Sequence, residues 1–474
     1  MATTQQPMTE FVKAISRLDA TALVVGSMIG SGIFIVSADI IRQTGSPALL
    51  LLVWAISGVV TLLGAITYGE LAAMFPKAGG QYVYLREGIS PLFGFLYGWT
   101  LFTVIQTATI AAVAVAFARF TAVLFPALSE QIILGGSVGG YNLGLSWQRL
   151  FAIVSVVILT WINVRGVRTA AIIQTTLTTV KTAALAGLIL LGITIGRNPE
   201  ALTANFGPNF WPAGGLTLAL LPVIGAAMVG SLFSMDAWNN VGFASGEMKN
   251  AEKDVPFAMV AGVGTVTLLY VLANVAYLNV LPASAIATAS QDRVGTAALQ
   301  AMFGDVGLYV MAVAIMISTF GCNNGLILSG ARVYYAMARD NLFFKKAGEL
   351  HPEYRTPTLA LIVQAVWTSL LALSGTYGDL LNYIIFGAVL FYMLTVIGLF
   401  ILRVRRPDAP RPVKAPGYPW LPGIYVVATG LICINLLIEK PLYSWPGLII
   451  IALGVPVYFV WRSLGARTGS QRTL

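Results

Sequence analysis

Residues 24–36, with the sequence VVGSMIGSGIFIV, decide the fold because they place three glycines in the middle of an apolar segment. Gly26, Gly30 and Gly32 lie within seven residues, and glycine is a poor helix former. The surrounding segment, residues 18–41, is long enough to cross a lipid bilayer as a helix. The sequence therefore predicts a membrane-spanning helix that is interrupted near its middle.

The rest of the chain has the same apolar character. Of its 474 residues, 57% are hydrophobic and 10% are charged, and the mean hydropathy is +0.81. Soluble globular proteins carry about 25% charged residues. Apolar segments of about 20 residues recur as far as Trp461, and we identify twelve of them. The composition excludes a water-soluble enzyme and predicts an all-α polytopic membrane protein with about 12 transmembrane helices.

The net charge of +9 follows from the arrangement of the loops. Most of the 28 lysines and arginines lie on the side of the amino terminus. The gaps on the other side contain only Arg42, Arg149, Arg197, Arg293 and Lys440. Because cytoplasmic loops carry the excess of positive residues, we expect both termini to be cytoplasmic. The basic residues form no stripe that would bind nucleic acid, and we attribute the basic loop at residues 403–417 to topology rather than to lipid binding.

A second apolar segment carries polar residues at its centre. Residues 232–243, LFSMDAWNNVGF, place Asp236, Asn239 and Asn240 within the sixth span. Spans one and six occupy equivalent positions if the first ten spans form two halves of five. Paired interrupted helices in corresponding positions indicate a transporter with a binding site between inverted repeats. The sequence therefore predicts a 5+5 inverted repeat followed by two C-terminal helices.

The predicted spans divide the chain into six parts. No residue-level repeat relates the two halves, so the symmetry rests on hydropathy and spacing. The parts are a cytoplasmic tail (1–17), the first five-helix repeat (18–196), the second five-helix repeat (216–402), a basic cytoplasmic loop (403–421), two additional helices (422–461) and a cytoplasmic tail (462–474).

The two predicted breaks suit a small zwitterion. Lipid cannot satisfy the backbone groups of a broken helix, so a break must face protein or water. The second half of span one begins at Gly30, Ser31 and Gly32, where free NH groups and the positive helix end suit a carboxylate. The first half of span six ends near Phe233 and Ser234, where free carbonyls suit an ammonium group. The alternative for the glycines is close packing between helices.

Asp236 adds a carboxylate at the second break. A charged side chain at the bilayer centre costs about 2.5 to 3.5 kcal/mol on insertion scales, so such residues are normally functional. We expect Asp236 to contact an ammonium or cationic side chain, or to bind a proton. The alternative is a structural hydrogen bond to a neighbour. Trp238 either closes over a ligand or only packs within the bundle.

Lys181 is the second charge in the middle of a span, in the segment QTTLTTVKTAALAG at residues 174–187. It lies about 15 Å from either end of its span at helical rise, which is too far for its side chain to reach an interface. A carboxylate or a ring of carbonyls would keep the ammonium charged. The sequence therefore predicts that this ammonium occupies the place of a coupling cation.

Other charged residues near span ends are attributed to structure. Glu70, at the inner end of span two, is expected to pair with Lys77 or Arg86. Arg332 and Arg339, at the inner end of span eight, are expected to face the cytoplasm.

Two other classes of membrane protein find little support in the sequence. A membrane-embedded enzyme needs a nucleophile, a base or metal ligands at one depth. The chain has one histidine, His351, and two dispersed cysteines, Cys322 and Cys433, so we expect no cofactor, no metal site and no disulfide framework. A channel needs rings of charge or a carbonyl-lined filter, and the sequence indicates neither.

Three motifs resemble the amino acid, polyamine and organocation (APC) superfamily, and within it the L-type amino acid transporter-like permeases. The motifs are GSMIGSGIF at residues 26–34, PKAGGQYVYLREG at 76–88 and ARVYYAMARDNLFF at 331–344. The resemblance implies a leucine-transporter-like fold with helices 1 and 6 broken, in the plasma (inner) membrane. It also implies alternating access around a midplane site, with sodium-independent amino acid transport by exchange or by proton coupling.

The resemblance also assigns roles to particular residues. The amides of Gly30, Ser31 and Gly32 are similar to those that bind the substrate carboxylate in the family. The amine side would be met by Met28, Phe233, Ser234 and Asp236. Lys181 resembles the fifth-helix lysine that stands where a sodium ion lies in relatives.

The chain departs from the family pattern in two places. Met235 and Ala237 replace an aromatic residue and a glycine of the sixth helix, which leaves the substrate open between a zwitterionic amino acid and, through Asp236, a cationic amino acid or polyamine. The gap between spans three and four has no cysteine, whereas animal relatives use one there to bond a heavy chain. We therefore expect a stand-alone permease with an amino acid substrate and the lipid bilayer as partners, and no disulfide-linked heavy chain.

Overall fold

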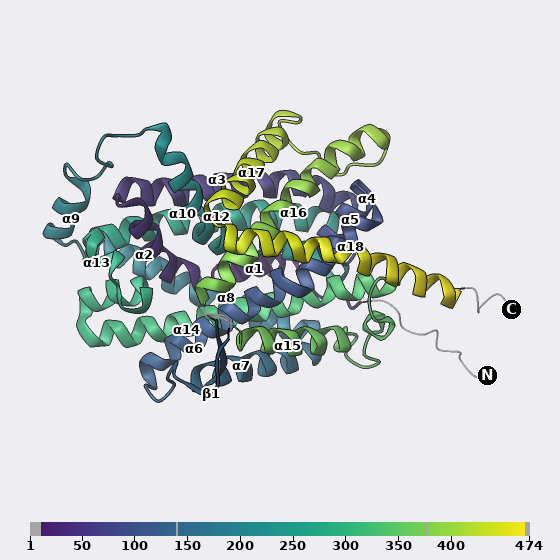
Figure 1. Ribbon diagram of the computed structural model, residues 1–474, viewed down its shortest axis with the longest axis horizontal. Helices are drawn as coiled ribbons and strands as arrows, with labels where there is room; N and C mark the ends of the chain where they lie inside the picture. The colour runs from purple at the N-terminus through teal and green to yellow at the C-terminus, as the bar shows by residue number, and fades with distance from the viewer. Residues whose placement is uncertain (1–10, 139–140, 375–376, 470–474) are drawn as a thin grey trace.

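The computed structural model describes residues 11–138, 141–374 and 377–469. Residues 1–10 and 470–474, which belong to the two predicted tails, lie outside the described residues. The long helices run side by side along the horizontal axis of Figure 1. Short helices α9 and α13 lie at one end of this bundle, and α4 lies toward the other end (Figure 1).

Most of the described chain is helical. Within the described ranges, ten helical segments have the length and hydropathy to cross a membrane, and two shorter apolar segments, Leu218–Ser234 and Thr358–Ala372, complete the twelve predicted spans. The α-helices are α1 (Arg17–Met28), α2 (Gly32–Thr44), α3 (Pro47–Met74), α4 (Gln81–Gly88), α5 (Pro91–Thr100), α6 (Gln106–Leu124), α7 (Trp147–Val164), α8 (Val167–Thr194), α9 (Pro199–Phe206), α10 (Leu221–Ser234), α11 (Asn240–Phe243), α12 (Ala251–Val280), α13 (Ala283–Ala287), α14 (Val294–Arg339), α15 (Thr358–Ala372), α16 (Tyr377–Arg405), α17 (Trp420–Glu439) and α18 (Pro441–Gly469).

The first span is interrupted where the glycines predict it. Helix α1 ends at Met28 and α2 begins at Gly32, so three residues separate the two halves. A capping box at Ser16 and Asp19 starts α1, because each side chain bonds to the backbone NH of the other residue. Gly45, with φ of +63°, ends α2 in the left-handed conformation that glycine adopts readily.

The sixth span is interrupted as well. Helix α10 ends at Ser234, and the chain becomes helical again in α11 at Asn240. Within the gap, Ala237 has φ of +67°, a conformation that residues other than glycine adopt rarely. Both predicted interruptions are thus confirmed.

One element departs from the all-α expectation. Strands β1 (Ile132–Val138) and β2 (Tyr141–Ser146) form an antiparallel pair in the loop between α6 and α7. They lie in one of the polar gaps between predicted spans, so the helical bundle itself is unchanged.

The expected partner of Glu70 is wrong. Its side chain is fully buried and accepts hydrogen bonds from Arg403 Nη2 at 2.5 Å and Arg411 Nε at 3.0 Å, not from Lys77 or Arg86. The backbone NH of Ala415 donates to the same carboxylate at 2.8 Å. These hydrogen bonds hold the basic loop against the end of α3. Two arginines of the loop, Arg403 and Arg411, therefore have a structural role.

The expected exposure of Arg332 is also wrong. Its guanidinium donates to both carboxylate oxygens of Glu247, at 2.9 and 2.8 Å, and the two side chains are each 1% exposed. The backbone carbonyl of Glu247 accepts the NH groups of Ala14 and Ile15, both at 3.0 Å. This buried pair connects α14, the end of the sixth span and the segment before α1.

Candidate functional site

The two breaks lie next to each other. Helix α2 packs against α10, and α1 packs against α8 and α12. A Cβ atom added to Gly32 would lie 2.7 Å from Ser234 Cβ and 3.1 Å from its Cα. The hydroxyl of Tyr270, from α12, lies 2.8 Å from the carbonyl oxygen of Met28 and 3.2 Å from that of Ser234. One tyrosine thus contacts the last residue of both half-helices, α1 and α10.

Lys181 of α8 binds the carbonyl side of the first break. Its ammonium donates to the carbonyl oxygens of Gly26 at 2.5 Å, Ile29 at 2.7 Å and Ser318 at 3.1 Å. The Lys181 side chain is buried, with 1% of its surface exposed. The three oxygens form the ring of carbonyls that was predicted as one way to keep this lysine charged.

The remaining carbonyls of the break also have donors. Ser318 Oγ lies 3.1 Å from the oxygen of Ile29 and 3.2 Å from that of Gly30, and Cys322 Sγ lies 3.0 Å from that of Ser27. These donors come from α14. The carbonyl side of the break is therefore satisfied inside the protein. The NH of Gly30 also has a partner, because it donates to the carbonyl oxygen of Met28 at 2.8 Å, and the NH of Phe34 donates to that of Ser31 at 3.0 Å.

Asp236 is part of a polar network that joins the second break to α16. Its carboxylate accepts a hydrogen bond from Tyr392, whose hydroxyl also lies 3.2 Å from Asn239 Oδ1. Asn239 in turn donates to Gln81 at 2.6 Å, and Gln81 donates to Thr395 at 3.0 Å. Asp236 is buried and forms no ion pair with any lysine or arginine that the structure describes.

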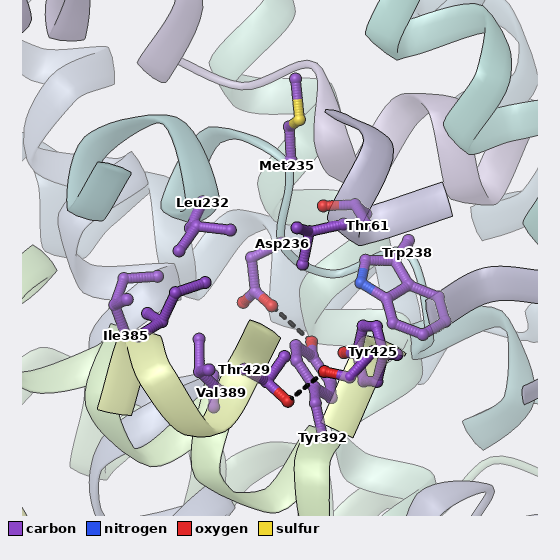
Figure 2. A pocket seen from close by; sticks show the side chains of 13 residues that line it. Thr61, Leu232, Met235, Asp236, Trp238, Ile385, Val389, Tyr392, Tyr425 and Thr429 are labelled. Atoms are coloured by element: carbon purple, nitrogen blue, oxygen red, sulfur yellow. Dashed lines mark hydrogen bonds between the residues drawn. The ribbon is translucent and has the colours of Figure 1, made fainter. Parts of the chain in front are cut away.

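A small cavity of about 20 Å³, enough for about one water molecule, borders Asp236 between α3, the second break, α16 and α17. Figure 2 shows the Asp236 side chain pointing toward Tyr392, with Thr61 and Trp238 beside it. The ring of Trp238 packs edge-on against Tyr68 with 4.8 Å between centroids, and its centroid lies 5.3 Å from that of Tyr392. The lining residues are Val60, Thr61, Leu232, Met235, Asp236, Trp238, Ile385, Ala388, Val389, Tyr392, Tyr425, Thr429 and Ile432.

The predicted site residues fall into two groups. Gly32 and Ser234 are in contact, and Met28 lies beside them through Tyr270. Asp236 and Trp238 face the cavity on the α16 and α17 side, and no residue of the first break lines that cavity.

Three of the predicted residues lie beside these groups. A Cβ on Gly30 would lie 3.1 Å from Cys322 Sγ of α14, so this glycine faces α14 rather than the second break. Phe233 is buried at the end of α10, and Ser31 is buried at the start of α2.

The residues whose side chains donate hydrogen bonds to the two breaks were not predicted from the sequence. Tyr270, Ser318 and Tyr392 each supply a hydroxyl to a break or to Asp236, yet each lies in an apolar span with no local pattern around it. A list of polar residues within predicted spans is the one signal that could have found them. Asn239 was noticed in that way, without its partner Gln81.

Two interrupted helices whose broken ends meet inside a helical bundle define the class of secondary transporters. The family model described as "Amino acid permease" matches residues 15–461, which is most of the chain. The chain belongs to the amino acid permease family.

Known transporters of this family resemble the chain over nearly its whole length. The serine/threonine exchanger SteT of Bacillus subtilis (strain 168) is 32% identical over 452 residues, covering 94% of this chain and 96% of the relative. The large neutral amino acids transporter small subunit 2 of Mus musculus is 31% identical, covering 94% and 81%. The Asc-type amino acid transporter 1 of Homo sapiens is 32% identical, covering 95% and 83%. The function is therefore amino acid transport, and the predicted alternatives of a cationic amino acid or polyamine transporter, a channel or an enzyme are not supported.

Proposed function

We propose that this protein exchanges neutral amino acids across the membrane without sodium. The observation that carries the proposal is the Lys181 ammonium, which three carbonyl oxygens bind beside the first break. A fixed ammonium among carbonyls leaves no room for a free cation at that position. The relatives include a serine/threonine exchanger and a transporter of large neutral amino acids, which supports neutral substrates.

The two breaks would bind opposite ends of the substrate, the first its carboxylate and the second its ammonium group. In this proposal the NH groups of Gly30, Ser31 and Gly32 bind the substrate carboxylate at the positive end of α2, and the Gly30 NH leaves the Met28 carbonyl to do so. The ammonium group would lie on the side of the second break, toward Asp236. Phe233 and Ser234 would contact the substrate on that side, and Met28 would lie beside it.

Trp238 has a proposed role in the shape of the site. Its indole ring is 2% exposed and packs against Tyr68 and Tyr392 at the cavity that Asp236 borders. In that position the ring would limit the size of the substrate side chain. Transport would proceed by alternating access, with no chemical change to the substrate.

The proposed setting is the plasma membrane, with both termini cytoplasmic. The excess of lysine and arginine on the amino-terminal side supports this orientation. A cysteine placed at the exposed Gln131 should react with an impermeant maleimide on intact cells, and one at the exposed Lys345 only after permeabilisation. The reverse pattern would overturn the orientation.

The chain is also proposed to work without a disulfide-linked heavy chain. Its two cysteines, Cys322 and Cys433, are both buried, with 2% and 6% of their surfaces exposed. A bond to another chain would need one of them at the surface. The purified single chain should therefore transport when it is reconstituted alone.

Exchange in proteoliposomes tests the proposed function. Purified protein is reconstituted in sodium-free buffer, and uptake of radiolabelled L-serine is measured with and without unlabelled L-serine inside the vesicles. We expect the internal serine to accelerate uptake, and leucine or threonine outside to compete. A requirement for sodium, equal uptake into empty vesicles, or competition by arginine or putrescine but not by neutral amino acids would contradict the proposal.

A further inference from the structure

A second cavity lies at the amino-terminal side of the bundle. Its volume is about 660 Å³, within the range of small-molecule sites in proteins. The cavity is bounded by the segment before α1, the loop between α3 and α4, helix α4, Gly246 after the sixth span, and the end of α14. None of its lining residues belongs to the two breaks or to the cavity beside Asp236.

Cations outnumber carboxylates around this cavity. Lys13, Lys77, Arg86 and Arg339 line it, against the single carboxylate of Asp340. That carboxylate is already engaged, because it pairs with Arg86 and accepts a hydrogen bond from the Tyr82 hydroxyl at 2.6 Å. Burial lowers the pKa of the Arg86 guanidinium, but the charge of Asp340 and the hydrogen bond to it more than offset this, so the pKa lies above its ordinary value.

Three cations of the cavity therefore have no counter-charge among the residues that the structure describes. Lys13, Lys77 and Arg339 are exposed, and none of them forms an ion pair with a residue that the structure describes. They come from three different segments of the chain. Positive groups that converge on a concave surface raise the local potential and attract anions. A zwitterionic amino acid carries no net charge, so this surplus is not explained by the transported substrate.

The cavity also has an apolar wall. The rings of Phe11 and Tyr335 pack edge to face with 4.8 Å between centroids, and both residues line the cavity. A ligand that fills the space would meet these rings on one side and the cations on the other.

We propose that this cavity binds a phosphate-bearing anion, with Lys13, Lys77 and Arg339 contacting the phosphate. A phosphate group offers up to two negative charges and three acceptor oxygens, which matches three cations from separate segments. The same chemistry is present in the headgroup of an anionic phospholipid and in soluble organic phosphates. Only the assignment of this cavity to the cytoplasmic side rests on the proposed orientation.

Occupancy of the cavity has a consequence for transport. The lining segments belong to the chain before α1, to the chain after the sixth span, and to α4 and α14. A ligand that contacts all of them stabilises the arrangement in which they are close together. The bound anion would therefore slow any step of the transport cycle that separates these segments.

Melting of the full chain in nanodiscs tests the proposal. The cavity variant carries Lys13→Gln, Lys77→Gln and Arg339→Gln, and the matched control carries Lys345→Gln, Lys346→Gln and Lys414→Gln, which remove three exposed cations outside the cavity. The soluble probe is pyrophosphate, added at constant ionic strength to nanodiscs of phosphatidylcholine. The lipid probe is a fraction of phosphatidylglycerol in the nanodisc, without pyrophosphate.

The two probes distinguish the source of the phosphate. We expect pyrophosphate at saturation to raise the melting temperature of the parent and of the control by about 2 °C or more, and not to raise that of the cavity variant. The same pattern with phosphatidylglycerol alone would assign the site to a lipid headgroup. Stabilisation of the cavity variant as strong as that of the parent, or no stabilisation by either probe, would overturn the proposal. Because melting does not measure transport, this failure would leave the proposed exchange untouched.

Discussion

Gly32 is a residue at which the two broken helices are in close contact. The atoms of Ser234 fill the position that a side chain at residue 32 would need, including the Ser234 Cα at 3.1 Å. Backbone atoms cannot rotate away as the end of a side chain can. Gly30 is different, because its added Cβ would first meet the side chain of Cys322, with Sγ at 3.1 Å and Cβ at 3.7 Å, and the nearest backbone atom, the Met28 carbonyl oxygen, would be 4.0 Å away.

We therefore expect alanine to destabilise the protein more at residue 32 than at residue 30. Gly32→Ala should push the half-helices apart and destabilise the protein by about 1 to 3 kcal/mol, the usual cost of overpacking, with serine uptake lost. Gly30→Ala should cost less in the same melting assay. Ser234→Gly, combined with Gly32→Ala, should recover part of the lost stability. Equal effects of the two alanine variants, with no recovery in the double variant, would contradict the close approach.

Lys181 stabilises the first break as a bound cation. Lys181→Met keeps the length of the side chain but leaves the carbonyls of Gly26, Ile29 and Ser318 without this donor. The Ile29 oxygen keeps Ser318 Oγ as a donor, and Ser318 lies within helix α14, so the loss falls mainly on Gly26. An unsatisfied buried carbonyl costs about 1 to 3 kcal/mol, so we expect a lower melting temperature and no measurable uptake. The exposed Lys253 provides the control, because Lys253→Met should retain both. A Lys181→Met protein that melts and transports like the parent would show that the ammonium has no structural or coupling role.

Replacing the Asp236 carboxylate should lower transport without lowering the stability of the protein. Asp236→Asn keeps an oxygen that accepts from Tyr392 but removes a carboxylate that has no cationic partner among the described residues. A buried charge without a partner is costly, so the melting temperature should stay the same or rise. Serine uptake should fall at least about tenfold, equivalent to about 1.4 kcal/mol. If melting falls while uptake is unchanged, the carboxylate has a structural role only.

At the level of elements, Glu70 fastens the loop after α16 to the end of α3. Four hydrogen bonds converge on its buried carboxylate, two from Arg403, one from Arg411 and one from the Ala415 amide. The Arg403 guanidinium also lies 3.8 Å from the centroid of the Tyr418 ring. This loop leads into α17, which borders the cavity beside Asp236.

We therefore expect Glu70→Gln to loosen α17 from the bundle. Breaking a buried ion pair by removing one partner costs about 3 to 5 kcal/mol, which should appear as a lower melting temperature in detergent. The protein that remains folded should still exchange serine, because Glu70 lies outside the breaks. Glu439→Gln, at the exposed end of α17, is the matched control and should melt like the parent. Unchanged melting of Glu70→Gln would show that the loop is held by other contacts.

The breaks could be predicted from the sequence because their causes are local. Glycines 26, 30 and 32 weaken the helix of the first span. Asp236 and its neighbouring asparagines interrupt the sixth span. The partners of the charged residues could not be predicted in this way. Glu70 and Arg403 are 333 residues apart, and Arg332 and Glu247 are 85 apart, so only the folded chain brings them together.

At the level of the whole molecule, the order and number of the spans follow from hydropathy, which reports how much of the chain a bilayer can accept. The adjacency of the breaks was inferred from the symmetry of two halves, and the contact between Gly32 and Ser234 agrees with it. The division into repeats at residues 18–196 and 216–402 stays a prediction. The cavity at α16 and α17 was not predicted, because the additional helix α17 contributes Tyr425, Thr429 and Ile432 to it.

A structure of the protein with bound L-serine tests the central claim most directly. We expect the serine carboxylate within about 3 Å of the NH groups at residues 30–32, and its ammonium group on the side of the second break, toward Asp236. Serine found only in the cavity between α3, α16 and α17, with its carboxylate away from the start of α2, would contradict the account.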